Sequence, residues 1–274
     1  MLKYTEGDFK VAKVNIHYYR IGGNKPPFIL LHGATDNGLC WTRTAEMLSR
    51  DYDVIMPDAQ GHGLSDRFST GHTPDSSADQ IAGLAKGLGL KKPFIMGHSM
   101  GAGTTASVAV KYPSLPGAII LEDPGWGMPP APQNADDEKK RTDDFRARSA
   151  SFRDRTLEDI LAESRKIDPI WDEDERIPWA QAKKQFDPAL FTAGGINRRP
   201  YTEIVPLIDC PTLLITSEKG IVTPEIAENA GRLWKSNKPF KQVRIMGAGH
   251  NIRREKFEEF YAAVTGFMRE INKK

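Results

Sequence analysis

The sequence lacks the features that mark several classes of protein. It has only two cysteines, Cys40 and Cys210, and they are too far apart to form a metal-binding pair, so neither a disulfide framework nor a zinc site is expected. No stretch approaches the roughly 18 apolar residues of a membrane span, and the first residues lack the apolar region of a signal peptide. We therefore expect a soluble, cytoplasmic protein without a metal ion or another cofactor.

An excess of charge of one sign is also missing. Lys and Arg total 38 and Asp and Glu total 36, so the net charge of the 274 residues is +2. A charge so close to balance produces no field that would attract nucleic acid or an anionic membrane. The expected partner is a small molecule. The chain is long enough to bury a full core as one large α/β domain, and we expect a monomer or a homodimer.

Short apolar runs recur along the chain, and segments of helical length separate most of them. The runs are 28–31, 54–56, 94–96, 118–121, 213–215 and 243–246. This alternation predicts an α/β fold in which a mostly parallel sheet has helices on both faces. Helices are expected near 40–48, 78–88, 104–112, 225–234 and 254–270, and alternation over 9–20 predicts an N-terminal strand or hairpin at a sheet edge.

One long segment, 125–205, departs from this rhythm. Charged residues make up 30 of its 81 positions, and no strand-like run interrupts it. It begins with the stiff sequence Met-Pro-Pro-Ala-Pro and contains aromatic residues that could line a pocket or pack the segment against the sheet. We expect a helical cap over 125–205, inserted into a core domain that is formed by 1–124 and 206–274.

The segment from Gly97 to Gly101 reads Gly-His-Ser-Met-Gly and fits the Gly-x-Ser-x-Gly nucleophile elbow. A strand-like run precedes it, and small and apolar residues at helical spacing follow it as far as Pro113. The motif needs this context, because the serine occupies a sharp turn and the flanking glycines let the strand and the helix pass closely. Ser99 is therefore the candidate nucleophile.

Polar residues also follow other apolar runs, at the points where parallel strands would end. A serine hydroxyl is a weak nucleophile at neutral pH, and it needs an imidazole to take its proton and an acid to orient that imidazole. His250 follows Gly-Ala-Gly after the last run and is the expected base. His98 lies inside the elbow and is expected to project away from Ser99. The adjacent pair Glu122 and Asp123 follows the run 118–121.

These motifs, together with Asp-Ala-Gln-Gly-His-Gly-Leu-Ser at 58–65, resemble the α/β-hydrolase superfamily in their order along the chain. The resemblance covers essentially the whole sequence and implies the α/β-hydrolase fold with a cap inserted after the sixth strand. It also implies Ser99 as nucleophile, His250 as base and an oxyanion hole made of the backbone amides of Ala34 and Met100. Each well-aimed amide of this kind is worth roughly 3 to 4 kcal/mol of transition-state stabilisation.

The sequence departs from that superfamily at the catalytic acid. Most members carry an Asp soon after the seventh strand, but here the Leu-Leu-Ile run is followed by Thr-Ser-Glu-Lys-Gly, which puts Gly220 at that position. Glycine cannot orient a histidine, so the acid is either Glu218 or a residue after the sixth strand, as in some haloalkane dehalogenases and zearalenone-type lactonases. Comparison with those relatives favours Glu122 as the acid. Asp123 is held in reserve, since the alternation of side chains along a strand lets only one of the two face the histidine.

A serine at the elbow argues against epoxide hydrolases and haloalkane dehalogenases, which resemble this scaffold but use an Asp there. We expect a serine hydrolase that cleaves a carboxylic ester or a lactone through an acyl-enzyme on Ser99. A carbon–carbon bond hydrolase, a perhydrolase or a small-molecule receptor that keeps the triad would use the same residues. Trp41, Trp126 and Met128 are expected to contact the substrate.

Overall fold

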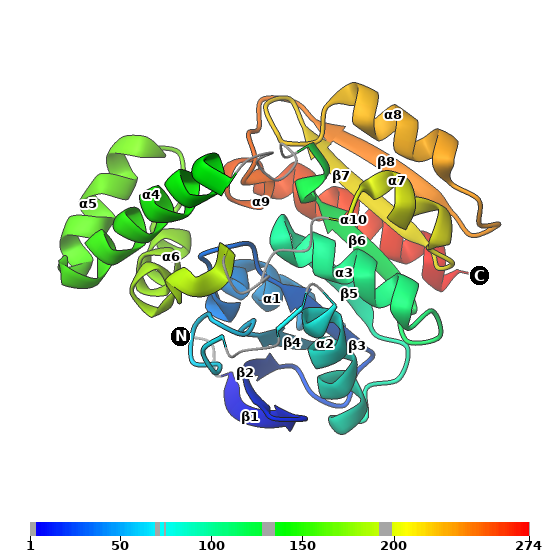
Figure 1. Ribbon diagram of the computed structural model, residues 1–274. Coiled ribbons are helices and arrows are strands. Elements are labelled where there is room, and N and C mark those ends of the chain that lie inside the picture. Colours follow the sequence, from blue (N-terminus) through cyan, green and yellow to red (C-terminus); the bar gives the residue numbers. More distant parts are fainter. Residues whose placement is uncertain (1–3, 69–71, 74, 128–134, 192–198, 274) are drawn as a thin grey trace.

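The structure is a computed structural model that describes residues 4–68, 72–73, 75–127, 135–191 and 199–273. Its centre is an eight-stranded sheet in the order β1-β2-β4-β3-β5-β6-β7-β8 (Figure 1). The N-terminal hairpin pairs antiparallel with β4, and every later pairing is parallel. The strands are β1 Thr5–Val11, β2 Val14–Ile21, β3 Pro27–Leu31, β4 Asp53–Pro57, β5 Phe94–His98, β6 Ala118–Glu122, β7 Thr212–Ser217 and β8 Phe240–Ile245.

Helices cover both faces of the sheet, as the alternating pattern predicts. On one face α1 (Thr42–Leu48) and α10 (Phe257–Asn272) bury a core against it. On the other face lie α2 (Ser76–Gly87), α3 (Met100–Lys111), α7 (Tyr201–Ile204) and α8 (Pro224–Leu233). The expected α/β architecture is therefore confirmed.

Strand β6 shows how residues are assigned to the two faces. Ala118 and Ile120 belong to the core on the α1 and α10 side, whereas Ile119 and Leu121 belong to the core on the α2 and α3 side. Successive side chains of a strand alternate between faces. Glu122 consequently points to the same side as Ala118 and Ile120, a placement that matters for the active site.

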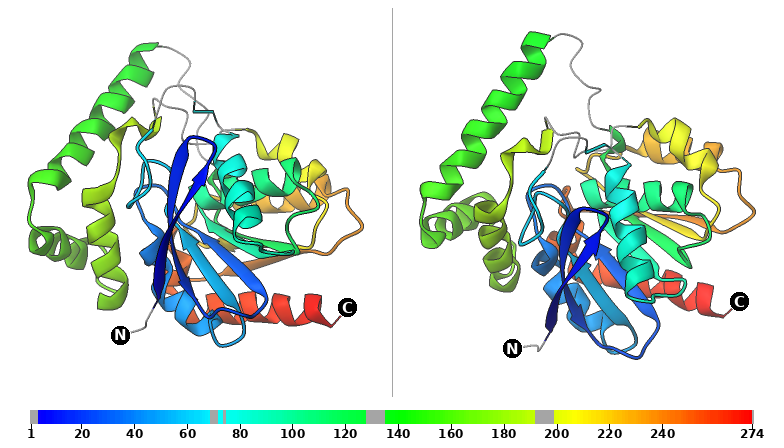
Figure 2. Two further views of the ribbon diagram at one scale, coloured as in Figure 1. Left: turned by 90° about the horizontal axis from the view of Figure 1, so that it is seen from below. Right: turned by 60° about the horizontal axis from the view of Figure 1, so that its bottom comes forward.

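The segment between β6 and β7 is helical and contains no described strand. Its helices α4 (Ala135–Asp154), α5 (Leu157–Ile167) and α6 (Glu173–Gln185) lie beside the sheet, away from both covering layers (Figures 1 and 2). They form a small apolar core of their own around Phe152, Ile160, Leu161 and Ala180. We call α4–α6 the cap helices.

Both ends of this segment lie on the core domain. Near its start, the short 3-10 helix η2 (Gly125–Gly127) lies so close to the backbone of Ile221 that a Cβ on Gly127 would stand 2.0 Å from the Ile221 oxygen. Near its end, Ile204 in α7 belongs to the core under α3. The remaining short helices are η1 (Gly38–Trp41), η3 (Pro188–Phe191), η4 (Val205–Leu207) and α9 (Ile252–Glu255). Among the described residues, no helix is both long and apolar enough to cross a membrane.

The crossing of β5 and α3 depends on two glycines. A Cβ on Gly97 would stand 2.2 Å from the carbonyl oxygen of Gly101, and a Cβ on Gly101 would stand 2.2 Å from the carbonyl oxygen of Leu31. Both distances are far shorter than any contact that a carbon atom tolerates. The glycines of the elbow motif are therefore needed for the close passage of the strand and the helix.

We expect the substitution Gly101→Ala to lower the free energy of unfolding by about 2 to 3 kcal/mol, because the backbone of β3 cannot move away from the added methyl group. Gly103 lies in the same helix, and a Cβ there would meet nothing within 4 Å. Gly103→Ala should instead stabilise the protein by about 0.5 to 1 kcal/mol. Urea unfolding of both variants measures the difference, and equal stabilities would contradict this account of the elbow.

Candidate active site

Ser99 lies at the sharp turn between β5 and α3. Its backbone has φ 52° and ψ −112°, a conformation that residues other than glycine rarely adopt. Its amide donates a hydrogen bond of 3.0 Å to the carbonyl oxygen of Glu122 at the end of the neighbouring strand. This hydrogen bond anchors the strained turn to β6. The turn places Ser99 at the carboxyl edge of the sheet.

Two backbone amides near Ser99 are the ones predicted to form an oxyanion hole. Met100 is the first residue of α3, and the first amides of a helix have no partner inside the helix. Ala34 belongs to the loop after β3, which runs close to Ser99, since a Cβ on Gly33 would stand 3.5 Å from the Ser99 Cβ. Neither the Ala34 nor the Met100 amide donates to another group among the described residues.

The loop that carries Ala34 is shaped by two histidines. The His32 ring contacts the Gly33 carbonyl oxygen through Nδ1 at 2.8 Å and accepts a bond of 3.0 Å from the Ala59 amide through Nε2. His62 Nε2 accepts a bond of 3.3 Å from the amide of Thr35. Burial lowers the pKa of both rings, so they are neutral supports for the loop.

His250 lies in the loop after β8 and pairs with Asp123. Its Nδ1 donates to the Asp123 carboxylate at 2.5 Å, and this carboxylate is fully buried. The carboxylate also accepts bonds from the amides of Ile221 and Val222, at 2.8 and 2.9 Å. Asp123 itself has a φ of 39°, in the left-handed region that Asp tolerates better than most residues.

The Asp123 carboxylate lies directly against Gly220. A Cβ on Gly220 would stand 2.7 Å from each carboxylate oxygen, so no side chain fits there while Asp123 holds its place. This is the position at which the common acid of the superfamily was expected from the sequence. The glycine makes room for a carboxylate that comes from the end of β6.

The prediction that Glu122 orients the histidine is wrong in its geometry, and the reserve residue Asp123 makes the contact. Strand alternation turns Glu122 to the α1 and α10 side, where its carboxylate accepts a bond of 2.9 Å from the amide of Arg253 and pairs with its guanidinium at 3.4 Å. Burial raises the pKa of Glu122, and the Arg253 charge opposes that rise. Glu218 is also remote from the histidine: it is exposed and accepts a bond of 2.9 Å from the Gly247 amide.

His98 supports the histidine loop, a role that was missed in the sequence. Its Nε2 donates to the carbonyl oxygen of His250 at 2.9 Å, and the two rings lie 4.6 Å apart. Burial lowers the pKa of His98 well below its ordinary value, so the ring remains neutral. Ser217 Oγ adds a second anchor by donating to the Gly249 carbonyl oxygen at 2.6 Å.

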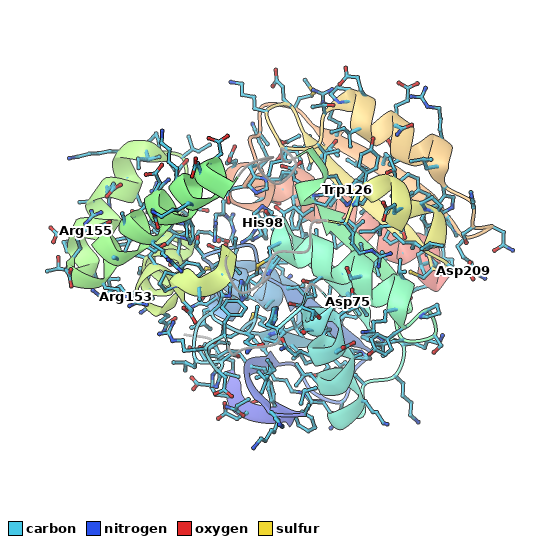
Figure 3. All side chains as sticks on the ribbon, in the orientation of Figure 1. Asp75, His98, Trp126, Arg153, Arg155 and Asp209 are labelled. Atoms are coloured by element: carbon cyan, nitrogen blue, oxygen red, sulfur yellow. The ribbon has the colours of Figure 1, made fainter. Side chains whose placement is uncertain are left out.

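A cavity of about 330 Å³ lies between the core domain and the cap helices. The core contributes Ala34, His98, Ser99, His250 and Arg254, and the cap contributes Phe145, Arg148, Phe152, Trp179, Lys183 and Phe186. Figure 3 places His98 between the cap helices and the core, while Arg153 and Arg155 lie at the far side of the cap. Ser99 and His250 thus share one small chamber whose aromatic side chains come largely from the cap.

Of the predicted substrate contacts, the two that the structure describes do not line this chamber. Trp41 is fully buried beneath the Arg253 guanidinium, which lies 4.2 Å from its ring centre. Trp126 stacks on Tyr201 of α7, with ring centres 5.6 Å apart, and Figure 3 shows it on the α7 side of the molecule. Met128 lies outside the described residues. The lining aromatic residues come instead from α4 and α6 and the residue that follows α6.

A group of buried charges forms part of the chamber wall. The Asp36 carboxylate contacts the guanidinium of Arg254 at 2.9 Å, that of Arg253 at 3.4 Å and the ammonium of Lys183 at 3.4 Å. Burial alone would raise the pKa of Asp36, but the charges of Arg254, Lys183 and Arg253 outweigh this and hold the pKa well below its ordinary value. Among the described residues, no three His, Cys, Asp or Glu side chains gather as metal ligands would.

Comparison with known proteins identifies the family and supports the fold. A model of the alpha/beta hydrolase family matches residues 28–263. The chain belongs to that family. The crystal structure of E-2-(acetamidomethylene)succinate hydrolase superposes with a TM-score of 0.80 at 23% identity, covering 97% of this chain and all of that one. The predicted α/β-hydrolase fold is therefore confirmed.

Curated relatives in bacteria include two named hydrolytic enzymes. 2-(Acetamidomethylene)succinate hydrolase of Mesorhizobium japonicum is 36% identical over 101 residues, which are 37% of this chain and 36% of that protein. The match therefore spans about a third of that relative's length. N-formylmaleamate deformylase of Pseudomonas putida is 27% identical, and the alignment covers 96% of both chains.

Exchanging the two adjacent carboxylates for amides tests the assignment of the acid in this hydrolase. Asp123→Asn should lower kcat for 4-nitrophenyl acetate about a thousandfold or more, because the amide favours the wrong histidine tautomer. Glu122→Gln should retain kcat within about tenfold, and it should lower the free energy of unfolding by up to about 3 kcal/mol because it weakens a buried ion pair. The measurement is kcat of both variants as folded proteins. A large loss of kcat in Glu122→Gln with little loss in Asp123→Asn would restore Glu122 as the acid.

Proposed function

We propose that this chain is a serine hydrolase that cleaves a small ester or lactone through an acyl-enzyme on Ser99. The observation that carries the proposal is the pairing of His250 with a buried Asp123, in a chamber that His250 shares with Ser99 and Ala34. A nucleophile, a base held by a carboxylate, and two free amides are the parts that acyl transfer needs.

In the proposed reaction, Ser99 Oγ attacks the substrate carbonyl carbon while Nε2 of His250 takes the serine proton. The negative charge that develops on the carbonyl oxygen is stabilised by the amides of Ala34 and Met100. The imidazolium, oriented by Asp123 through Nδ1, then gives its proton to the leaving oxygen. Water then gives a proton to His250 and attacks the acyl carbon. The bond from that carbon to Ser99 Oγ breaks as His250 returns the proton to Oγ, and the acid product leaves.

The chamber favours a substrate with an aromatic or apolar portion and a carboxylate. Phe145, Phe152, Trp179 and Phe186 form apolar walls, and the Arg148 guanidinium makes no ion pair with any described side chain. An unpaired guanidinium suits a planar carboxylate, to which it can donate two hydrogen bonds. The names of the two curated relatives, a succinate derivative and a maleamate, support an acidic substrate.

A second candidate is removal of an acyl group from nitrogen. The observation in its favour is the N-formylmaleamate deformylase, which aligns with this chain over nearly its full length. The same nucleophile, base and amides would act on an N-formyl group, and only the leaving atom would differ. Parallel assays of esters, lactones and N-formyl amides of small dicarboxylic acids distinguish the two candidates.

The serine is tested by substitution and by covalent labelling. Ser99→Ala should lower kcat for a reactive ester at least a thousandfold, because the acyl-enzyme cannot form. A fluorophosphonate should label the wild-type protein once, at Ser99, and should not label Ser99→Ala. The exposed Ser114, replaced by Ala, is the control and should behave as the wild type. A wild-type protein with neither turnover nor labelling would indicate a receptor and overturn the proposal.

The substrate charge is tested at Arg148. Replacement by Ala should raise KM about tenfold or more for a monoester of a dicarboxylic acid, because the carboxylate loses a charged hydrogen-bond partner. KM for the matching neutral diester should change less than about twofold. The neighbouring Arg146 is also exposed on α4 and does not line the chamber, so Arg146→Ala is the matched control. Equal effects on the two esters would contradict carboxylate binding by Arg148.

A further inference from the structure

The ammonium group of Lys183 crosses from the cap to the loop that carries the oxyanion-hole residue Ala34. Lys183 lies in α6 and is buried. Its Nζ donates to the Thr35 carbonyl oxygen at 2.9 Å and to Thr35 Oγ1 at 2.7 Å, and it contacts the Asp36 carboxylate at 3.4 Å. All three contacts fall on the two residues directly after Ala34.

These contacts use the whole donor capacity of the lysine. An ammonium has three N–H groups, and each has a protein acceptor here. The remaining face of the group lies 4.6 Å from the ring centre of Trp179, in the same helix. Although Lys183 lines the chamber, it has no donor left for a substrate. It therefore differs from Arg148, which faces the same chamber without an ion pair among the described residues.

The loop needs such a support, because its backbone is held in an uncommon conformation. Thr35 has a φ of 64°, in the left-handed region, and it is β-branched, which makes that region more unfavourable. This conformation sets the direction of the peptide group that joins Ala34 to Thr35, and the Ala34 amide lies one peptide group before it. Lys183 fixes the Thr35 side chain and carbonyl together.

Two further contacts from α6 reach the same region of the core. Asn37, two residues beyond Thr35, donates through its side chain to Gln185 at 2.8 Å. Glu175, at the other end of α6, accepts from Arg254 at 3.4 Å, and Arg254 in turn contacts Asp36. Docking of α6 on the core and the geometry of the loop are thus maintained by one set of buried polar contacts.

We propose that Lys183 is a positioning residue through which the cap holds the oxyanion-hole loop, so that the Ala34 amide is aimed at the reacting oxygen only while α6 is docked. The proposal rests on the function proposed above. Its consequence is that a cap helix outside the core domain controls the chemical step as well as substrate binding. A substrate that draws the cap helices onto the core would thereby complete its own oxyanion hole.

The matched experiment compares Lys183→Met with Lys184→Met. Lys184 is the next residue of the same helix, and its ammonium bonds to the carbonyl oxygens of Phe152, Arg153 and Arg155 within the cap. Both variants lose one cation and several hydrogen bonds of α6, but only Lys183→Met releases the loop. We expect kcat for a neutral ester to fall about 10- to 100-fold in Lys183→Met, with KM within about twofold. Lys184→Met should keep kcat within about twofold.

Fluorophosphonate labelling measures the same effect without any assumption about the substrate. In that reaction the Ser99 Oγ–phosphorus bond forms, the phosphorus–fluorine bond breaks, the serine proton passes to His250 and fluoride leaves. The phosphoryl oxygen occupies the oxyanion hole. The labelling rate should therefore fall in parallel with kcat in Lys183→Met, while the final extent of labelling shows that the protein is folded.

Restoring an ammonium group at position 183 tests whether that group positions the loop, as distinct from stabilising the whole protein. Lys183→Cys, alkylated with 2-bromoethylamine, regains a side chain of nearly lysine length that ends in an ammonium group. Cys40 and Cys210 are buried, and burial raises the pKa of both thiols to about 12, which protects them from the reagent. Alkylation should recover at least tenfold in labelling rate. Thr35→Val, which removes a single acceptor of Lys183, provides a milder variant and should slow labelling about 3- to 10-fold.

The outcomes separate this inference from the proposed function. A wild-type protein that is neither labelled nor active overturns the proposed function. A labelled wild type with equally fast labelling of Lys183→Met, or of Thr35→Val if the former does not fold, overturns only the role of Lys183. A defect confined to KM for the carboxylate-bearing ester would also overturn it, since Lys183 would then bind the substrate.

Discussion

A carboxylate that is buried away from water must receive hydrogen bonds from the protein, and Asp123 receives them from three directions. The histidine after β8 donates one bond, and two amides after β7 donate the others. Because Asp123 itself directly follows β6, this one group joins three neighbouring strand ends. The orientation of His250 and the path of the loop through Gly220 both depend on it.

A second set of buried charges joins the cap to the core. Asp36, Glu122 and Glu175 are matched by Arg253, Arg254 and Lys183, so three negative groups face three positive ones. Desolvation makes such contacts weak sources of stability, but they tolerate few alternative arrangements. We therefore expect these paired charges to fix one position of the cap helices on the core more strictly than an apolar contact would.

Chemistry and recognition come from different parts of the chain. The core places the candidate nucleophile, base, acid and amides after the carboxyl ends of parallel strands, where open α/β sheets concentrate their active groups. The cap helices supply the aromatic walls and Arg148. The motifs of the core therefore indicate the type of reaction, whereas the proposed substrate preference depends on the cap helices.

Local motifs were sufficient for the parts of the site that depend on neighbouring residues. The elbow around Ser99 needs a strand, a sharp turn and a helix in immediate succession, and all three are visible in the sequence together with the glycines that permit the crossing. The parallel sheet could likewise be predicted, because apolar runs of strand length alternate with helical segments. His250 followed from its place between the last strand and the last helix.

Other features were decided by contacts between distant segments. Glu122 and Asp123 are adjacent and chemically alike, and only the face to which β6 turns each of them separates a partner of Arg253 from a partner of His250. Trp41 was expected in the substrate site, yet the packing of Arg253 over its ring keeps it in the core. Lys183 lies 148 positions from the loop that it contacts, and no local pattern reveals such a pairing. The sequence by itself determined the turn that presents Ser99 and the sheet that carries it, since these depend on local backbone sterics. The tertiary structure decided which carboxylate pairs with His250, which side chains line the chamber and what Lys183 contacts, because burial forces polar groups from separate segments to satisfy one another.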